Sequence, residues 1–261
     1  MITTETRGPV TVVTLDRPEA RNALTGEMVR SMAEAFAACD ADPGVRVVVL
    51  TGRDPAFCAG LDLKDLARTY DQVGATGEGA RRPDRVGFPR PDKPLIGAVN
   101  GPAVTGGLEL ALGCDFLVAS ERATFADTHA RVGVMPAGGL TIRLPRLVGI
   151  NRARQMSLTG DFVDAHRAGA WGLVNEVVPH EALLGRALEL AAAVAEVDPA
   201  AVSELAAMYA SLAFRSDDEA YVDEARWSRR WMRRHFDADA LAARRGDIIE
   251  RGSAQQEGGH P

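Results

Sequence analysis

The chain of 261 residues is poor in lysine, cysteine and aromatic residues. Lysine occurs only at positions 64 and 93, arginine supplies the remaining positive charge, and the formal net charge is −6. This balance disfavours a nucleic-acid-binding surface. No apolar run approaches the roughly 20 residues that a membrane-spanning helix needs, and the polar residues 1–8 lack the apolar segment of a secretory signal. The sequence therefore predicts a cytoplasmic protein with no nucleic-acid or membrane partner.

The nucleophilic and metal-binding residue types form no recognisable motif. Three cysteines, at positions 39, 58 and 114, are odd in number and lack metal-ligand spacing, which is typical of thiols in a reducing compartment. The five histidines are scattered without H-E-x-x-H spacing, and no G-x-S-x-G serine elbow occurs. Cys58 has no evident base to activate it, so we expect a small buried residue there. No metal is predicted.

Apolar patterns predict an α/β core followed by a helical tail. Runs rich in apolar and β-branched residues predict strands at 10–15, 45–50, 95–99, 115–119 and 173–178. Helical spacing predicts helices at 25–40, with Thr25 as cap, and at 138–147, 151–158 and 164–170. The stretch 68–92, rich in glycine, arginine and proline, predicts a loop.

The tail begins at about Glu181, and a break at Asp198-Pro199 divides the chain into domains 1–197 and 198–261. Beyond the break lie most of the aromatic side chains, which we expect to pack in a core: Tyr209, Phe214, Tyr221, Trp227 and Trp231.

Two segments place small residues where a predicted strand gives way to a helix. They are Phe57-Cys-Ala-Gly-Leu-Asp-Leu-Lys64 and Gly101-Pro-Ala-Val-Thr-Gly-Gly-Leu-Glu109. Backbone N–H groups at such turns lack ladder partners, and small side chains let a substrate oxygen approach them. Two facing turns would supply the paired donors of an oxyanion hole. Glu109 follows Gly106 by three residues, so on a helix a carboxylate stands beside a donor.

Through these segments the chain resembles the enoyl-CoA hydratase/isomerase (crotonase) superfamily. The resemblance runs from about Val10 to Val178, and six landmarks follow the family's order: residues 17–25, 57–64, 99–115, 133–139, 158–160 and 168–178. It implies an α/β fold with a crotonase-like spiral core of ββα units. It also implies a C-terminal helical region that mediates trimerisation and covers an active site, in a homotrimer or a dimer of trimers.

The resemblance also implies roles for residues of the glycine-rich segments. The oxyanion donors would be the N–H groups of Ala59 and Gly106, and Glu109 matches the family's first catalytic glutamate. The hydratases carry a second catalytic glutamate where this chain has His129. Histidine can act as the second acid/base or form a polar wall of the site, and both readings stay open. Asp127 could orient the imidazole, although an exposed turn residue is the expectation.

Coenzyme A would enter as part of the substrate, with no separate cofactor. The resemblance implies that its adenine and 3′-phosphate lie against the segments that hold Arg21 and Lys64, which can pair with phosphate. The candidate residues for binding the CoA thioester are Arg21, Ala59, Gly60, Leu61, Asp62, Lys64 and Gly106.

These inferences predict an enoyl-CoA hydratase of fatty-acid or related acyl-CoA metabolism. Glu109 would activate water for addition to a 2-enoyl-CoA thioester, and His129 would supply or relay the second proton. Two alternatives stay open: an enoyl-CoA isomerase, and a non-catalytic acyl-CoA-binding homologue. A serine-peptidase relative is disfavoured because no serine stands at the second turn.

Overall fold

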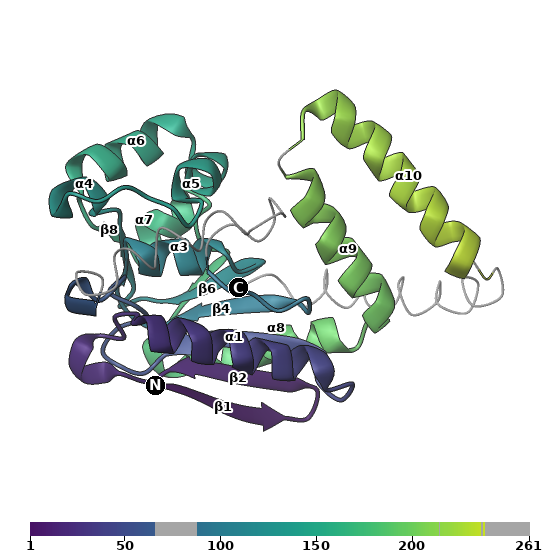
Figure 1. Cartoon of the computed structure of the whole chain (residues 1–261), viewed down its shortest axis with the longest axis horizontal. Helices are drawn as coiled ribbons and strands as arrows, with labels where there is room; N and C mark the ends of the chain where they lie inside the picture. Colours follow the sequence, from purple (N-terminus) through teal and green to yellow (C-terminus); the bar gives the residue numbers. More distant parts are fainter. Residues whose placement is uncertain (66–87, 214, 236, 238–261) are drawn as a thin grey trace. The chain divides into compact units, whose positions relative to one another are not determined.

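The computed structural model describes residues 1–65, 88–213, 215–235 and 237 (Figure 1). The chain forms two compact units, Met1–Ala207 and Met208–Pro261. Our sequence analysis placed the domain boundary earlier, between residues 197 and 198. Most of the predicted loop 68–92 lies outside the described residues.

The first unit is built of strands and helices. The strands are β1 (Ile2–Arg7), β2 (Val10–Leu15), β3 (Val47–Gly52), β4 (Leu95–Val99), β5 (Ala103–Val104), β6 (Phe116–Ser120), β7 (Thr124–Ala126), β8 (Val163–Asp164) and β9 (Glu176–Val178). The helices are α1 (Gly26–Ala41), α3 (Gly106–Leu112), α4 (His129–Val132), α5 (Leu140–Val148), α6 (Ile150–Thr159), α7 (Ala165–Ala170), α8 (Leu183–Ala195) and α9 (Pro199–Leu212), which continues into the second unit. Short 3-10 turns are η1 (Pro18–Ala20) and η4 (His180–Ala182).

Within the described residues, six strands form a sheet in the order β1-β2-β3-β4-β6-β9, and β5, β7 and β8 form a smaller one. In the large sheet β1 and β2 pair antiparallel, while the other neighbours pair parallel. The edge strand β1 escaped prediction because five of its six residues are exposed, which removes the apolar alternation that marks a strand.

The two faces of the large sheet pack against different helices. Val48 and Leu50 of β3 belong to the apolar cluster that includes α1, whereas Val47 and Val49 belong to the cluster formed with α8. Successive side chains of a strand point to opposite faces. Because helices cover both faces, β3 is apolar at every central position, which explains the unbroken run in the sequence.

Most predicted elements are confirmed, with shifts at their ends. The predicted β2 and β4 agree residue for residue, β3 lies two residues later, and β9 covers only the end of the predicted 173–178. Helix α1 begins as predicted, because the Thr25 hydroxyl oxygen accepts a hydrogen bond from the N–H of Met28 at 3.2 Å.

The second unit contains the end of α9 and α10 (Asp217–His235). Tyr209 and Tyr221 have 72% and 73% of their surfaces exposed, so the expectation that they pack in a core is wrong for both. Phe214 lies outside the described residues. In the part of the chain that the structure describes, no helix combines the length and apolar character that crossing a membrane requires.

The turns that follow β3 and β4 lie side by side. The N–H of Cys58 donates to the carbonyl oxygen of Pro102 at 3.0 Å, and the N–H of Val104 donates to the carbonyl oxygen of Cys58 at 2.9 Å. A Cβ added at Gly107 would lie 2.0 Å from that Cys58 oxygen. Only glycine therefore permits this approach of two backbones.

We expect Gly107→Ala to destabilise the first unit by about 2 kcal/mol or more, because backbone rather than a flexible side chain must move to admit the methyl group. The matched control is Gly185→Ala in α8, an exposed position where an added Cβ meets nothing within 4 Å. This control should gain roughly 0.5–1 kcal/mol. Urea unfolding of both variants measures the difference, and a Gly107→Ala protein as stable as the parent would contradict the close approach.

Candidate active site

Backbone hydrogen bonds hold the first glycine-containing segment, residues 57–64 (the first motif), against residues 21–24. The N–H of Ala59 donates to the carbonyl oxygen of Arg21 at 3.0 Å. The N–H of Leu24 donates to the carbonyl oxygen of Gly60 at 2.7 Å, and that of Asp62 to the carbonyl oxygen of Leu24 at 2.9 Å. The chain from Ala59 to Asp62 is therefore held along the segment that precedes α1.

These bonds correct one of the predicted oxyanion donors. The N–H of Ala59 is occupied by Arg21 and is not available to a substrate, contrary to our expectation. Among the described residues, the N–H groups of Leu61 and Gly106 have no hydrogen-bond acceptor. A Cβ built on Gly106 would lie 3.4 Å from the Leu61 nitrogen, so the two groups are neighbours. The geometry therefore favours Leu61 and Gly106 as the donor pair.

Thr105 holds a backbone conformation that threonine rarely adopts. Its φ of 55° and ψ of −112° place a β-branched residue in the positive-φ region. The N–H of Thr105 donates to the carbonyl oxygen of Ala126 at 2.8 Å, and its hydroxyl lies 2.5 Å from that of Thr128. Such strain costs of order 1–3 kcal/mol and persists only where the surroundings hold it. The conformation of Thr105 sets the direction of the following peptide N–H, which belongs to Gly106.

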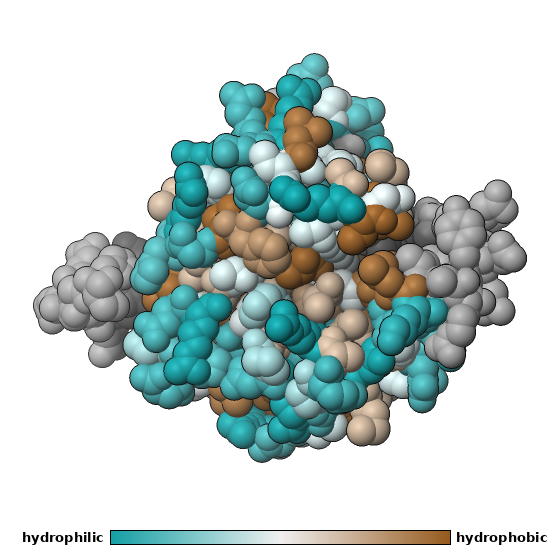
Figure 2. Space-filling model, turned by 90° about the vertical axis from the view of Figure 1, so that its left-hand side faces the viewer, coloured by the Kyte–Doolittle hydropathy of each residue, from teal (hydrophilic) through white to brown (hydrophobic). Residues whose placement is uncertain are grey.

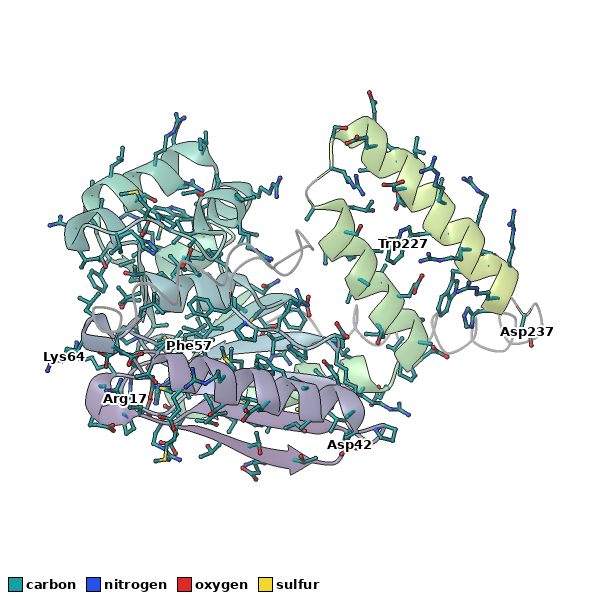
Figure 3. The ribbon with its side chains drawn as sticks, in the orientation of Figure 1. Arg17, Asp42, Phe57, Lys64, Trp227 and Asp237 are labelled. Carbon is teal, nitrogen blue, oxygen red and sulfur yellow. The ribbon has the colours of Figure 1, made fainter. Side chains whose placement is uncertain are left out.

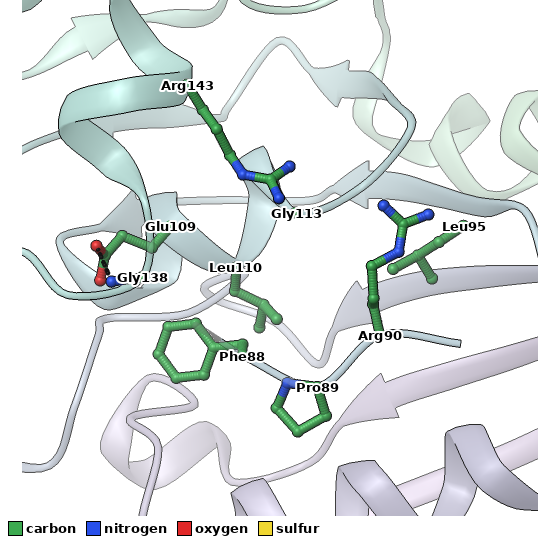
Figure 4. A pocket seen from close by; sticks show the side chains of 9 residues that line it. All are labelled: Phe88, Pro89, Arg90, Leu95, Glu109, Leu110, Gly113, Gly138 and Arg143. Carbon is green, nitrogen blue, oxygen red and sulfur yellow. Dashed lines mark hydrogen bonds between the residues drawn. The ribbon is translucent and has the colours of Figure 1, made fainter. Parts of the chain in front are cut away.

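Glu109 lies in the first turn of α3 and is only 5% exposed. One carboxylate oxygen, Oε1, accepts a hydrogen bond from the N–H of Gly138 at 2.6 Å and a long one from the N–H of Leu140 at 3.5 Å. Figure 4 shows the carboxylate facing Gly138. Burial raises the pKa of Glu109, and the Gly138 donor and His129 limit the rise. A carboxyl group with a raised pKa is suited to exchange protons near neutral pH.

Glu109 lines a pocket, and apolar side chains form the neighbouring wall of this pocket. It is formed by Phe88 and Leu110, and Arg90 and Arg143 stand beyond Leu110 in Figure 4. Arg90 pairs with Asp115 at 2.9 Å, and Arg143 donates to a backbone carbonyl of α3 at 3.1 Å. Both arginines thus tie neighbouring elements together, while the apolar wall limits water around the carboxylate.

His129 lies across the site from Glu109, at the start of α4. Its Nε2 is 3.8 Å from Oε2 of Glu109, and its Nδ1 is 2.6 Å from Oδ1 of Asp127. Asp127 is 1% exposed, so the expectation of an exposed turn residue is wrong. Burial acts to raise the pKa of Asp127, but hydrogen bonds from His129 and Ser157 outweigh it and leave the pKa below its usual value.

The predicted CoA-binding side chains lie around the first motif. Arg21 and Lys64 are exposed, and Figure 3 shows Lys64 directed away from the body of the first unit. The carboxylate of Asp62 makes internal contacts instead, because it accepts from the N–H groups of Lys64 and Asp65 and pairs with Arg17 at 2.7 Å. Asp62 therefore caps the turn that presents Lys64.

Cys58 has the properties of an inert buried residue. Its side chain is fully buried, and burial raises the pKa of the thiol to about 12. The thiolate, which is the nucleophilic form, is thus disfavoured near neutral pH. Over the described residues, no three or more His, Cys, Asp or Glu side chains gather in a way that could hold a metal ion.

Three features of the site escaped the sequence analysis: the Gly138 donor to Glu109, the contact between Thr105 and Thr128, and the burial of Asp127. The Asp-x-His spacing does place Asp127 and His129 on one side of an extended segment. Ser157 of α6, whose hydrogen bond lowers the pKa of Asp127, lies far along the chain and leaves no local signal.

A family model described as enoyl-CoA hydratase/isomerase matches residues 5–230. The chain is 43% identical over 187 residues to a probable peroxisomal enoyl-CoA hydratase 1 of Arabidopsis thaliana, covering 72% of this chain and 69% of the relative. It is 41% identical over 206 residues to the enoyl-CoA hydratase EchA19 of Mycobacterium tuberculosis, covering 77% of each.

Solved structures agree with this relationship. The crystal structure of an enoyl-CoA hydratase from Mycobacterium tuberculosis H37Rv superposes with a TM-score of 0.71 at 50% sequence identity, covering 80% of this chain and 88% of that chain. The likeness confirms the predicted crotonase-like fold. The chain belongs to the enoyl-CoA hydratase/isomerase family.

Proposed function

We propose that this protein is an enoyl-CoA hydratase that adds water to 2-enoyl-CoA thioesters. Relatives about 40% identical that are named enoyl-CoA hydratases support this activity. The observation that carries the proposal is the neighbouring pair of N–H groups, from Leu61 and Gly106, beside the buried carboxylate of Glu109. His129 completes an acid/base pair at 3.8 Å.

The two N–H groups act on the thioester oxygen of the substrate. Attack of water at C3 moves negative charge through C2 onto this oxygen, which accepts hydrogen bonds from Leu61 and Gly106. Donors aimed at a developing oxyanion lower the barrier by about 3–4 kcal/mol each. Because both donors belong to the backbone, the side chain of Leu61 does not alter the chemistry.

Glu109 and His129 move the two protons. The carboxylate of Glu109 takes a proton from water as the oxygen bonds to C3, and the imidazolium of His129 gives its Nε2 proton to C2. The product is a 3-hydroxyacyl thioester, which leaves Glu109 protonated and His129 neutral. Transfer of the proton from Glu109 to Nε2 of His129 restores the starting state; the two atoms lie 3.8 Å apart, so the transfer needs a closer approach or one bridging water.

We expect Glu109→Gln and His129→Ala each to lower kcat for hydration by about 10²-fold or more, because each removes one proton-transfer group. Mass and NMR analysis of products from a chain-length series of 2-enoyl-CoA esters measures this. Unchanged thermal unfolding and retained binding of a saturated acyl-CoA are the controls. Hydration at the parent rate by either variant would remove that residue from the mechanism. No hydration by the folded parent protein would overturn the proposal, and a shifted double bond would indicate an isomerase.

We also propose that Lys64 binds a phosphate of coenzyme A. Lys64→Ala should then raise KM for 2-enoyl-CoA about tenfold with little change in kcat, because hydrogen bonds to charged groups contribute roughly 1.5–3 kcal/mol. The same variant should be indistinguishable from the parent on pantetheine thioesters, which lack the nucleotide. Arg154→Ala, at an exposed position of α6, is the control. An equal effect of Lys64→Ala on both substrates would refute a phosphate contact.

For the assembly we propose a homotrimer or a dimer of trimers. Figure 2 shows hydrophobic residues gathered in patches on one face of the molecule. Around α4 to α6 the exposed apolar residues include Met135 (75%), Leu158 (79%) and Phe162 (57%). Monomeric soluble proteins seldom expose large apolar patches, which often mark interfaces.

We therefore expect the double variant Leu158→Asp/Phe162→Asp to reduce the molar mass measured by light scattering toward that of one chain. Charges at an apolar interface must be desolvated without partners, which opposes association. Thr3→Asp, at an exposed position on β1, is the control and should keep the parent mass. A double variant of unchanged mass would exclude Leu158 and Phe162 from the interface.

A further inference from the structure

We propose that Asp127 is a positioning residue that fixes the tautomer of His129. The proposal rests on the proposed hydration only for its kinetic consequence, because the imidazole geometry exists without substrate. The carboxylate of Asp127 and the imidazole of His129 are two residues apart in the chain and 2.6 Å apart in space. Both side chains are buried, at 1% and 6% exposure.

The carboxylate of Asp127 is itself held on several sides. Its Oδ1 also accepts a hydrogen bond from the backbone N–H of His129 at 3.2 Å, and Ser157 of α6 bonds to the carboxylate. The hydrogen bonds from His129 and Ser157 keep the pKa of Asp127 low, so the carboxylate of Asp127 is ionised near neutral pH. Aspartate in this form can only accept hydrogen bonds. The ring nitrogen that faces it, Nδ1, must therefore carry a proton.

The other nitrogen, Nε2, then becomes the reacting atom. A neutral imidazole protonated at Nδ1 presents the Nε2 lone pair toward Glu109, 3.8 Å away. When His129 takes up a second proton, Asp127 stabilises the imidazolium through the same short hydrogen bond. Without this carboxylate the neutral ring could place its proton on either nitrogen, and only one of the two arrangements can receive the proton from Glu109.

Asp127 acts through His129 and does not reach the substrate in this assignment. A carboxylate at position 129 would need no such partner, since both of its oxygens can exchange a proton. An imidazole does need one. The Asp-x-His pair is thus the unit that takes the place of a second glutamate in this chain.

The first test observes the tautomer directly. In protein labelled with ¹⁵N-histidine, the His129 signals, assigned by their loss in His129→Ala, should show a protonated Nδ1 and an unprotonated Nε2 in the neutral ring. Asp127→Ala, which removes the Oδ1 atom that faces Nδ1, should shift the ring to a mixture or to the opposite tautomer. Ser157→Ala, which removes only the outer support, should change the signals little. An unchanged tautomer in Asp127→Ala, with thermal unfolding like that of the parent, would overturn the proposal.

The second test separates positioning from a structural role. Asp127→Asn should lower kcat at least about tenfold with KM within twofold of the parent, as expected when the carboxylate that orients a catalytic histidine is lost. In a His129→Ala background the same substitution should cause no further loss, because no imidazole remains to be positioned. An equal loss of kcat in both backgrounds would show that Asp127 acts independently of His129 and would overturn the proposal. If the parent protein hydrates no enoyl ester, the proposed function fails, while the NMR result still decides the tautomer assignment.

Discussion

The site depends on the direct contact of two backbones, at Cys58 and Gly107. The carbonyl oxygen of Cys58 accepts a hydrogen bond from Val104, and no side chain at Gly107 separates the chains. This contact brings the turn after β3 against the start of α3. The N–H groups of Leu61 and Gly106 consequently become neighbours, and Glu109 lies in the first turn of the same helix, on the same face as Gly106. A donor pair built from backbone costs little reorganisation when charge develops, because its direction is already set.

The environment of Glu109 balances two opposed effects. Desolvation by the apolar wall favours the neutral carboxyl group, whereas the N–H of Gly138 favours the charged form. A Cβ at Gly138 would lie 2.7 Å from the carboxylate carbon, so the donor can come this close only from glycine. With desolvation the larger effect, the pKa is raised but the carboxylate keeps a hydrogen-bond partner. Such a group can take a proton from water and then pass it on.

The sequence predicts those features of the site that neighbouring residues encode, and it does not predict those that depend on contacts between distant parts of the chain. Glycine-rich segments after apolar strands predicted the two turns, and the three-residue spacing predicted Glu109 beside Gly106. The choice between Ala59 and Leu61 was beyond reach, because it depends on which N–H groups of the first motif bond to the segment at Arg21 and Leu24. Likewise the spacing paired Asp127 with His129, but no local pattern marks the burial of Asp127 or its hydrogen bond from Ser157 of α6. The resemblance to the family identified Ala59 where the hydrogen bonds favour Leu61.

Hydrogen bonds also join the turn at Thr105 and Gly106 to the segment 126–129 that contains His129. Thr105, whose strained backbone aims the N–H of Gly106, bonds through its own N–H to Ala126 and through its hydroxyl to Thr128. These two partners flank Asp127, and Thr128 immediately precedes His129. A displacement of the histidine would therefore disturb the donor that receives the oxyanion, and relief of the strain at Thr105 would loosen the imidazole. An imidazole requires a more exact placement than a flexible carboxylate, and the contacts of Thr105 with Ala126 and Thr128 provide it together with the Asp127 carboxylate.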